Sequence, residues 1–256
     1  FVGAASGAAF TTQPQVTVKD SAGNTVTSST ATVTATISGG GALVGTITAA
    51  AASGVATFID LGVSAPKGTK AITFTVTGLA TIAQNVAVTV GAATMVALTQ
   101  SPQIISSGST FTTQPKITIR DSGGNTVTSS TATVTATISD GGTLVGTNSA
   151  TAVSGIATFL DLGIGGLADT TYTVTFTALG LTSFDTRCTI TYCVGSTGPS
   201  GGIVFYIAET FFTSTGSLCD TTCTYLEAAP ENWGNGITVA EGESTGSLIV
   251  DPRLKW

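Results

Sequence analysis

Residues 10–38 of this chain, FTTQPQVTVKDSAGNTVTSSTATVTATIS, recur almost unchanged as residues 111–139, FTTQPKITIRDSGGNTVTSSTATVTATIS. At an offset of 101 residues, 24 of the 29 positions are identical. Solenoid repeats have periods of about 20–50 residues, so a period twice as long is that of a whole domain. The chain therefore contains two tandem copies of one domain.

The two copies also match further downstream. SGVATFIDLG at residues 53–62 recurs as SGIATFLDLG at residues 154–163. The loop that follows differs between the copies, and we predict that the second copy loses one residue there, which aligns Ile72 with Tyr172. The last part of the chain has no counterpart in the repeat. We therefore expect three domains, over residues 1–92, 93–192 and 193–256.

Apolar and threonine side chains alternate within each copy, as in TVTATIS at residues 32–38. Alternation with period two places the apolar side chains on one face of a β-strand. Turn sequences such as DSAGNT at residues 20–25 and DSGGNT at residues 121–126 separate these segments, which is typical of a β-sandwich. The chain is 42% hydrophobic and only 9% charged, which excludes a disordered protein. We predict an all-β protein.

The repeated motifs resemble a known family. FTTQP, the DS(A/G)GNT turn and SG(V/I)ATF(I/L)DLG are similar to motifs of the bacterial immunoglobulin-like (Ig-like) repeats in surface proteins of the invasin/intimin type, over residues 1–192. The resemblance implies tandem Ig-like β-sandwiches, export to the bacterial cell surface and end-to-end stacking of domains. It also implies that the repeats carry no catalytic chemistry.

A second resemblance lies in the C-terminal segment. GGIVFY at residues 201–206, YLEAAP at residues 225–230 and Trp233 resemble the opening of Lcl-type bacterial C-terminal surface domains, over about residues 195–233. This resemblance implies a partial, cysteine-containing C-terminal domain and binding of polysaccharide. An aromatic and acidic patch would then contact the glycan, while packing inside the domain is the alternative role for the same side chains. The candidate glycan contacts are Tyr225, Glu227, Glu231 and Trp233.

The four cysteines, Cys188, Cys193, Cys219 and Cys223, all lie in the last third of the chain. An even number of cysteines in an exported protein predicts two disulfides, with three possible pairings. A zinc site is disfavoured because the spacing is not Cys-x-x-Cys and the chain has no histidine. The cysteines are therefore disulfide candidates that favour an extracellular location.

Composition and charge disfavour several other functions. The net charge of −6 argues against nucleic-acid binding, which requires clustered Lys and Arg. No uninterrupted apolar stretch is long enough for a membrane span. GPSGG at residues 198–202 matches the nucleophile-elbow pattern, but a serine nucleophile of that kind needs a histidine base, which this chain lacks. We expect no enzymatic activity.

Four aspartates recur at equivalent places in the two copies. Within DSAGN and DSGGN, an aspartate side chain is suited to accept hydrogen bonds from its own turn. Carboxylates at such places also suit calcium, which remains the alternative to a purely structural role, and we expect no other cofactor. The aspartates are Asp20, Asp60, Asp121 and Asp161.

The second copy begins with an apolar–polar segment, residues 94–100, whose counterpart would precede Phe1. We therefore predict that repeat 1 has an open groove beside Val16 and Val18 that accepts a strand. That strand comes either from a neighbouring subunit, which would give an open-ended polymer, or from upstream residues of the same chain.

Together these patterns predict an extracellular structural protein of the bacterial cell surface, either a stalk or a filament subunit. Its partners would be copies of itself or neighbouring surface subunits. The alternative is an adhesin whose C-terminal region binds polysaccharide.

Overall fold

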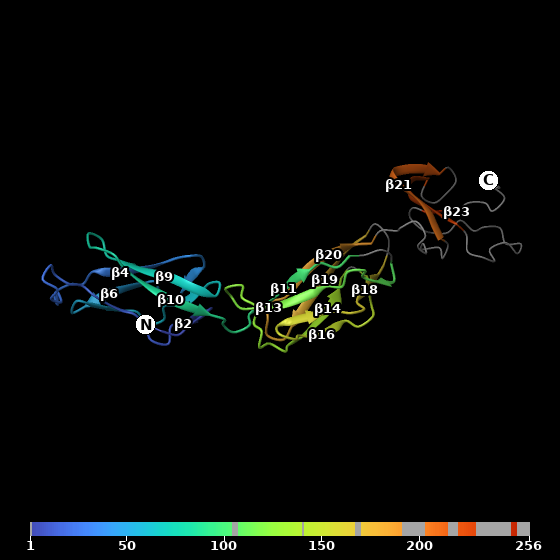
Figure 1. Cartoon of the computed structure of the whole chain (residues 1–256). Coiled ribbons are helices and arrows are strands. Elements are labelled where there is room, and N and C mark those ends of the chain that lie inside the picture. The colour runs from blue at the N-terminus through green and yellow to red at the C-terminus, as the bar shows by residue number, and fades with distance from the viewer. Residues whose placement is uncertain are drawn as a thin grey trace, which may run out of the picture.

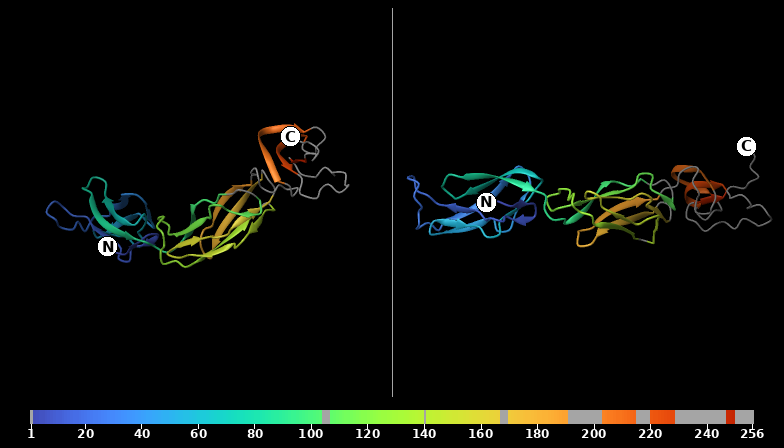
Figure 2. Two further views of the ribbon diagram at one scale, coloured as in Figure 1. Left: turned by 45° about the vertical axis from the view of Figure 1, so that its right-hand side comes forward. Right: turned by 60° about the horizontal axis from the view of Figure 1, so that its bottom comes forward.

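The computed structural model describes residues 2–103, 107–139, 141–166 and 170–190, together with the backbone of three strands nearer the C-terminus. This described part is all-β and contains no helix, as the sequence predicts. Two elongated sandwiches, repeat 1 and repeat 2, lie end to end in every view (Figure 1, Figure 2). The three C-terminal strands form one sheet; they are β21 (Ile203–Ser214), β22 (Asp220–Ala228) and β23 (Ser247–Ile249).

Repeat 1 contains ten strands in two sheets. One sheet has the order β1-β10-β9-β4-β6-β7-β3, and the other has the order β2-β8-β5. All neighbouring strands are antiparallel except β1 and β10. The strands are β1 (Ala4–Ala5), β2 (Ala8–Ala9), β3 (Gln15–Thr17), β4 (Thr32–Ser38), β5 (Ala42–Val44), β6 (Thr48–Ala52), β7 (Val55–Thr57), β8 (Gly62–Ser64), β9 (Gly68–Thr75) and β10 (Ile82–Thr89).

Repeat 2 has counterparts of β2 to β10 and in addition one long strand, β11, at its start. Its sheets have the orders β11-β13-β17, β12-β18-β15 and β16-β14-β19-β20. The strands are β11 (Met95–Gln100), β12 (Ser109–Thr110), β13 (Lys116–Arg120), β14 (Thr133–Ile138), β15 (Thr143–Val145), β16 (Ser149–Thr151), β17 (Ile156–Thr158), β18 (Gly163–Gly165), β19 (Thr171–Ala178) and β20 (Phe184–Thr189).

Each repeat has its own hydrophobic core between its sheets. The alternating side chains point as the sequence pattern requires, since Val33 and Ala35 of β4 are buried while the threonines on either side of each are not. An aromatic pair marks the centre of each core. Phe58 and Phe74 have ring centroids 5.4 Å apart in repeat 1, and the centroids of Phe159 and Phe176 are 5.5 Å apart in repeat 2.

The strand register corrects one sequence prediction. Ala35 pairs with Phe74 in repeat 1, and the matching Ala136 pairs with Phe176 in repeat 2. The offset after the loop is therefore 102, so repeat 2 gains a residue rather than losing one, and the counterpart of Ile72 is Val174 instead of Tyr172. The predicted and observed offsets differ by two residues. A shift of two residues leaves every side chain on the same face of its strand, and for this reason the alternation pattern cannot distinguish the predicted offset from the observed one.

Candidate functional site: the joint and the open edge

The two repeats are joined by a turn of repeat 2 that inserts into the end of repeat 1. This joint is formed by the turn at residues 121–125 and the facing groups of repeat 1. The Lys67 N–H donates to the Asn125 side-chain oxygen at 2.7 Å, and the Asn125 side-chain amide donates to the Ala65 carbonyl at 3.0 Å. The hydroxyls of Ser64 and Ser122 lie 3.0 Å apart. Main-chain and side-chain polar groups of each repeat therefore form hydrogen bonds with polar groups of the other repeat.

Asp121 is the buried centre of this joint. Its side chain is fully buried and accepts a hydrogen bond from the Gly91 N–H of the linker at 2.8 Å. It also accepts bonds from the N–H groups of Gly123 and Asn125, both at 2.9 Å, which close its own turn. Burial alone would raise the pKa of Asp121, but the hydrogen bonds from Gly91, Asn125 and Gly123 outweigh this effect and lower it. The carboxylate therefore stays ionised while it ties the linker to the turn.

The same turn in repeat 1 is fully exposed. Asp20 accepts hydrogen bonds from the N–H groups of Ala22 at 3.0 Å and Asn24 at 2.8 Å, as Asp121 does within its own turn. All residues of the turn at 20–24 face solvent. The hydrogen bonds to the Asp20 carboxylate lower its pKa, and the bond from the Asn24 N–H has the largest effect. The two turns thus have one local structure and two different environments.

One substitution within the repeated stretch distinguishes the two turns. A Cβ atom at Gly123 would lie 2.3 Å from the Ala65 carbonyl oxygen and 2.3 Å from the Ser6 hydroxyl oxygen. The φ angle of Gly123 is not positive, so the backbone conformation does not require a glycine here. Glycine is required because the joint has no room for a side chain at this position. The equivalent residue in repeat 1 is Ala22, whose methyl group would prevent the same close approach.

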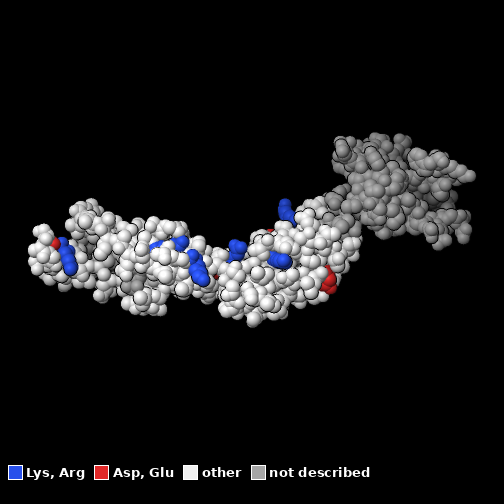
Figure 3. Space-filling model, in the orientation of Figure 1, with Lys and Arg blue, Asp and Glu red and all other residues white. Residues whose placement is uncertain are grey.

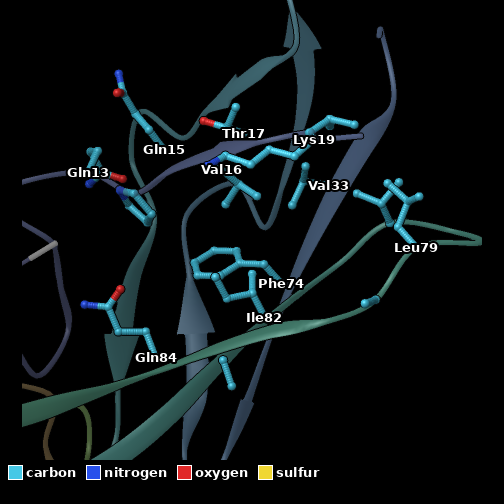
Figure 4. Close-up of a pocket in the computed structure, with 15 residues that line it drawn as sticks. Gln13, Gln15, Val16, Thr17, Lys19, Val33, Phe74, Leu79, Ile82 and Gln84 are labelled. Carbon is cyan, nitrogen blue, oxygen red and sulfur yellow. The ribbon is translucent and has the colours of Figure 1, made fainter. Parts of the chain in front are cut away.

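The free edge of β3 is the second distinctive feature. In repeat 2, β13 lies between β11 and β17. In repeat 1, the equivalent β3 pairs with β7 alone among the described strands. A groove of about 790 Å³ lies along this edge, lined by residues that include Val16, Val18, Phe74, Leu79 and Ile82. Figure 4 shows Val16 and Val33 above the ring of Phe74, with Ile82 beside it.

Apolar side chains in this groove are more exposed than their counterparts in repeat 2. Leu79 is 47% exposed and Ile82 is 60% exposed. Their equivalents, Leu181 and Phe184, are partly buried against the core of repeat 2. In that core Val96 of β11 is 3% exposed. The apolar groove of repeat 1 therefore corresponds to the space that β11 fills in repeat 2.

The other two predicted aspartates each accept hydrogen bonds from a threonine 14 residues earlier in the chain. Asp60 accepts hydrogen bonds from the Thr46 N–H at 2.8 Å and from its hydroxyl at 3.2 Å. Asp161 does the same with Thr147 at 3.0 and 3.1 Å. No cluster of three or more possible metal ligands occurs among the described residues. These hydrogen bonds connect two separate segments of each repeat, which supports a structural role for Asp60 and Asp161, and calcium remains only a sequence-based alternative.

Cys188 is the only cysteine whose side chain the structure describes. It is 5% exposed and belongs to the core of repeat 2, where it pairs with Tyr172 across β19 and β20. Burial raises the pKa of this thiol to about 11. The other three cysteines and the candidate glycan contacts lie outside the described side chains, so the disulfide and glycan interpretations stay predictions. These are Cys193, Cys219, Cys223, Tyr225, Glu227, Glu231 and Trp233.

Charged side chains are sparse over the two repeats. Figure 3 shows isolated basic and acidic groups separated by wide uncharged areas on the face it presents. Among the described residues, no helix is long and apolar enough to cross a membrane.

Comparison with known proteins gives only distant similarities. No protein-family model matches the chain, and no curated protein matches it. The chain is similar to the D0-D1 domain of intimin, with 18% identity, 69% of this chain and 88% of that chain covered, and a TM-score of 0.29. It is also similar to the Escherichia coli adhesin FdeC, with 16% identity, 74% and 61% coverage, and a TM-score of 0.33.

An enzyme structure shows a similarity of the same size. A glycosyl hydrolase family 2 member from Bacteroides cellulosilyticus is 15% identical over 54% of this chain, with a TM-score of 0.34, and the chain spans 19% of its length. Similarities with TM-scores below 0.5 do not distinguish an adhesin from an enzyme. The Ig-like fold assignment therefore rests on the strand order and the two repeated cores.

Proposed function

We propose that this chain is a structural segment of an extracellular bacterial surface protein, in which Ig-like repeats are locked end to end as a stalk. The observation that carries the proposal is the joint centred on Asp121. A linker with free rotation would leave Gly91, Lys67 and the turn at 121–125 solvated, whereas here each is hydrogen-bonded across the joint. A defined angle between successive domains is what a spacer needs in order to hold a terminal domain away from the cell.

The composition supports the same proposal. The chain has 22 charged residues in 256, with no histidine, and the described side chains contain no cluster that could hold a metal. The repeats offer rigid β-structure in place of reactive groups. A filament subunit is the finer form of this proposal, and an adhesin with a glycan-binding C-terminal segment is its alternative.

Small-angle X-ray scattering tests the locked joint. The wild-type chain is expected to give the pair-distance distribution of one elongated particle, and Asp121→Ala is expected to broaden it toward shorter distances. Asp20→Ala removes the same turn acceptor where no joint exists, so it is the matched control and should leave the distribution unchanged. Equal effects of the two substitutions would contradict the stalk proposal.

Location and assembly need separate measurements. Immunogold labelling of intact source cells with antibodies against the repeats should place gold outside the cell envelope. Negative-stain microscopy distinguishes single rods, expected for a stalk, from polymers, expected for a filament. Saturable binding on a glycan array that requires Trp233 would favour the adhesin.

A further inference from the structure

Residues 4–9 form a strap that ties the two sheets of repeat 1 together. Within the strap, β1 pairs with β10 of one sheet, and β2 pairs with β8 of the other sheet. The chain crosses between the sheets at Ser6 and Gly7. Just after β1, the Ser6 N–H donates to the Thr89 carbonyl at 3.0 Å. Just before β2, the Gly7 N–H donates to the Val63 carbonyl at 2.7 Å, so the crossing is hydrogen-bonded to both sheets.

The pairing of β1 with β10 differs in direction from the rest of repeat 1. It is parallel, whereas the other neighbouring strands that the structure describes in this repeat are antiparallel. Ala4 lies opposite Val88, and both side chains are buried in the core of repeat 1. Along the chain, β1 comes before the other described strands of the repeat and β10 comes after them. Tension along the chain therefore pulls the two parallel strands in opposite directions along their axes, which loads the hydrogen bonds between them together, in shear.

The turn of repeat 2 that forms the joint covers the point where both strands end. After β1, Gly7 has no room for a Cβ atom because the Ser122 hydroxyl occupies that place. After β10, Gly91 packs so closely against the Ser6 carbonyl that a Cβ atom would overlap it. The Gly91 N–H also donates to the Asp121 carboxylate at 2.8 Å. Repeat 2 therefore holds the crossing of the strap and the end of β10 at the same time.

We propose that repeat 1 is a load-bearing unit whose resistance to force depends on the docked turn of repeat 2. This inference rests on the stalk function proposed above, since a stalk transmits tension between its ends. With the turn docked, the strap is held at Ser6 and Gly7, so tension has to break the pairing of β1 with β10 in shear. With the turn undocked, the crossing moves away from the sheet and β1 is peeled from β10 one hydrogen bond after another, which requires less force.

Optical tweezers test the proposal by loading repeat 1 alone within the full chain. Handles are attached through azide-bearing residues placed at Val2 and Ala92, which are both exposed, so repeat 2 stays docked but lies outside the load path. The rate of unfolding under constant load measures the resistance to force. Asp121→Ala is expected to unfold repeat 1 at least about tenfold faster than the wild type, because the joint loses its buried acceptor. Asp20→Ala, the matched change in the exposed turn, should leave the unfolding rate at the wild-type value.

A second variant covers the case in which Asp121→Ala unfolds repeat 2. Asn125→Ala removes the hydrogen bonds to Ala65 and Lys67 but keeps Asp121 and the main-chain bonds of the turn, so repeat 2 should stay folded. This substitution leaves the sequence of repeat 1 unchanged, yet repeat 1 should again unfold at least about tenfold faster under load. In both variants the unfolding rate should also rise more steeply with load, because peeling lengthens the chain further than shear does before the pairing breaks.

Two outcomes would overturn the load-bearing proposal and leave the stalk proposal standing. In the first, Asn125→Ala unfolds at the wild-type rate under load although small-angle scattering shows that its joint is open. In the second, the variants unfold faster but with the wild-type dependence on load, which means that the joint adds stability without directing the load. A joint that stays closed in Asp121→Ala would instead contradict the stalk proposal itself.

Discussion

The substitution Asp121→Ala removes the side-chain acceptor that joins Gly91 of the linker to the turn of repeat 2. The Gly91 N–H, now bonded to the Asp121 carboxylate at 2.8 Å, would lose its partner in a part-buried position. The turn would also lose its internal bonds from the Gly123 and Asn125 N–H groups. Asn125 would then no longer be oriented toward Ala65 and Lys67.

The expected cost follows from burial. Leaving a buried donor without its partner costs about 1–3 kcal/mol, and Asp121 is fully buried. A loss of about 2 kcal/mol in the free energy of local opening corresponds to an increase of about thirtyfold in the amide exchange rate, since each 1.4 kcal/mol is a factor of about ten. The effect should be local to the joint, with the core of repeat 2 still folded.

Residue-resolved hydrogen exchange measures this directly. The amides of Gly91 and Lys67 should exchange about thirtyfold faster in Asp121→Ala than in the wild type. Asp20→Ala, the matched change in the exposed turn, should leave both amides as they are. Unchanged protection of Gly91 and Lys67 in Asp121→Ala would refute the role assigned to the carboxylate.

Three further predictions concern the same residues and the buried thiol. The lowered pKa of Asp121 means that its carboxylate contributes to stability at pH values above 3.8, the ordinary pKa of the group. This contribution is lost as the pH falls through the lower pKa of the folded state, so scattering curves should indicate loosening of the joint only below pH 3.8. Gly123→Ala should open the joint because its methyl group meets the Ala65 carbonyl, whereas Ala22→Gly should change no scattering curve; an unaltered profile for Gly123→Ala would contradict this. With a pKa of about 11, a free Cys188 thiol should resist alkylation at neutral pH in the native protein and react after unfolding, and failure to react after unfolding without reductant would indicate a disulfide instead.

Much of the fold follows from local patterns. The alternation in TVTATIS decides which face of β4 is buried, because successive side chains of a strand point to opposite sides. The aspartate, glycine and asparagine of DSAGN and DSGGN predict tight turns, because their side chains and φ angles satisfy the turn within a few residues. Recurrence of both patterns at one offset implies two copies of one domain, and the two cores agree with it.

The register beyond the loop was decided by strand pairing. The hydrogen bonds that align Ala136 with Phe176 connect residues far apart in the sequence. A two-residue error there conserves the pattern of inward and outward side chains, and only the pairing itself excludes it.

The joint likewise depends on tertiary structure. Asp20 and Asp121 stand in nearly identical sequences and accept the same local bonds, yet one is exposed and the other is fully buried. The one sequence signal was the glycine at 123 in place of Ala22, and its meaning requires the position of the Ala65 carbonyl. The sequence by itself determined two copies of one β-domain, their turns and their inward faces, because those properties depend on the repeat itself and on neighbouring residues. Which of the two turns is locked in a joint was decided only when distant segments came together, since burial and hydrogen bonding across a joint depend on what packs there and not on the local sequence.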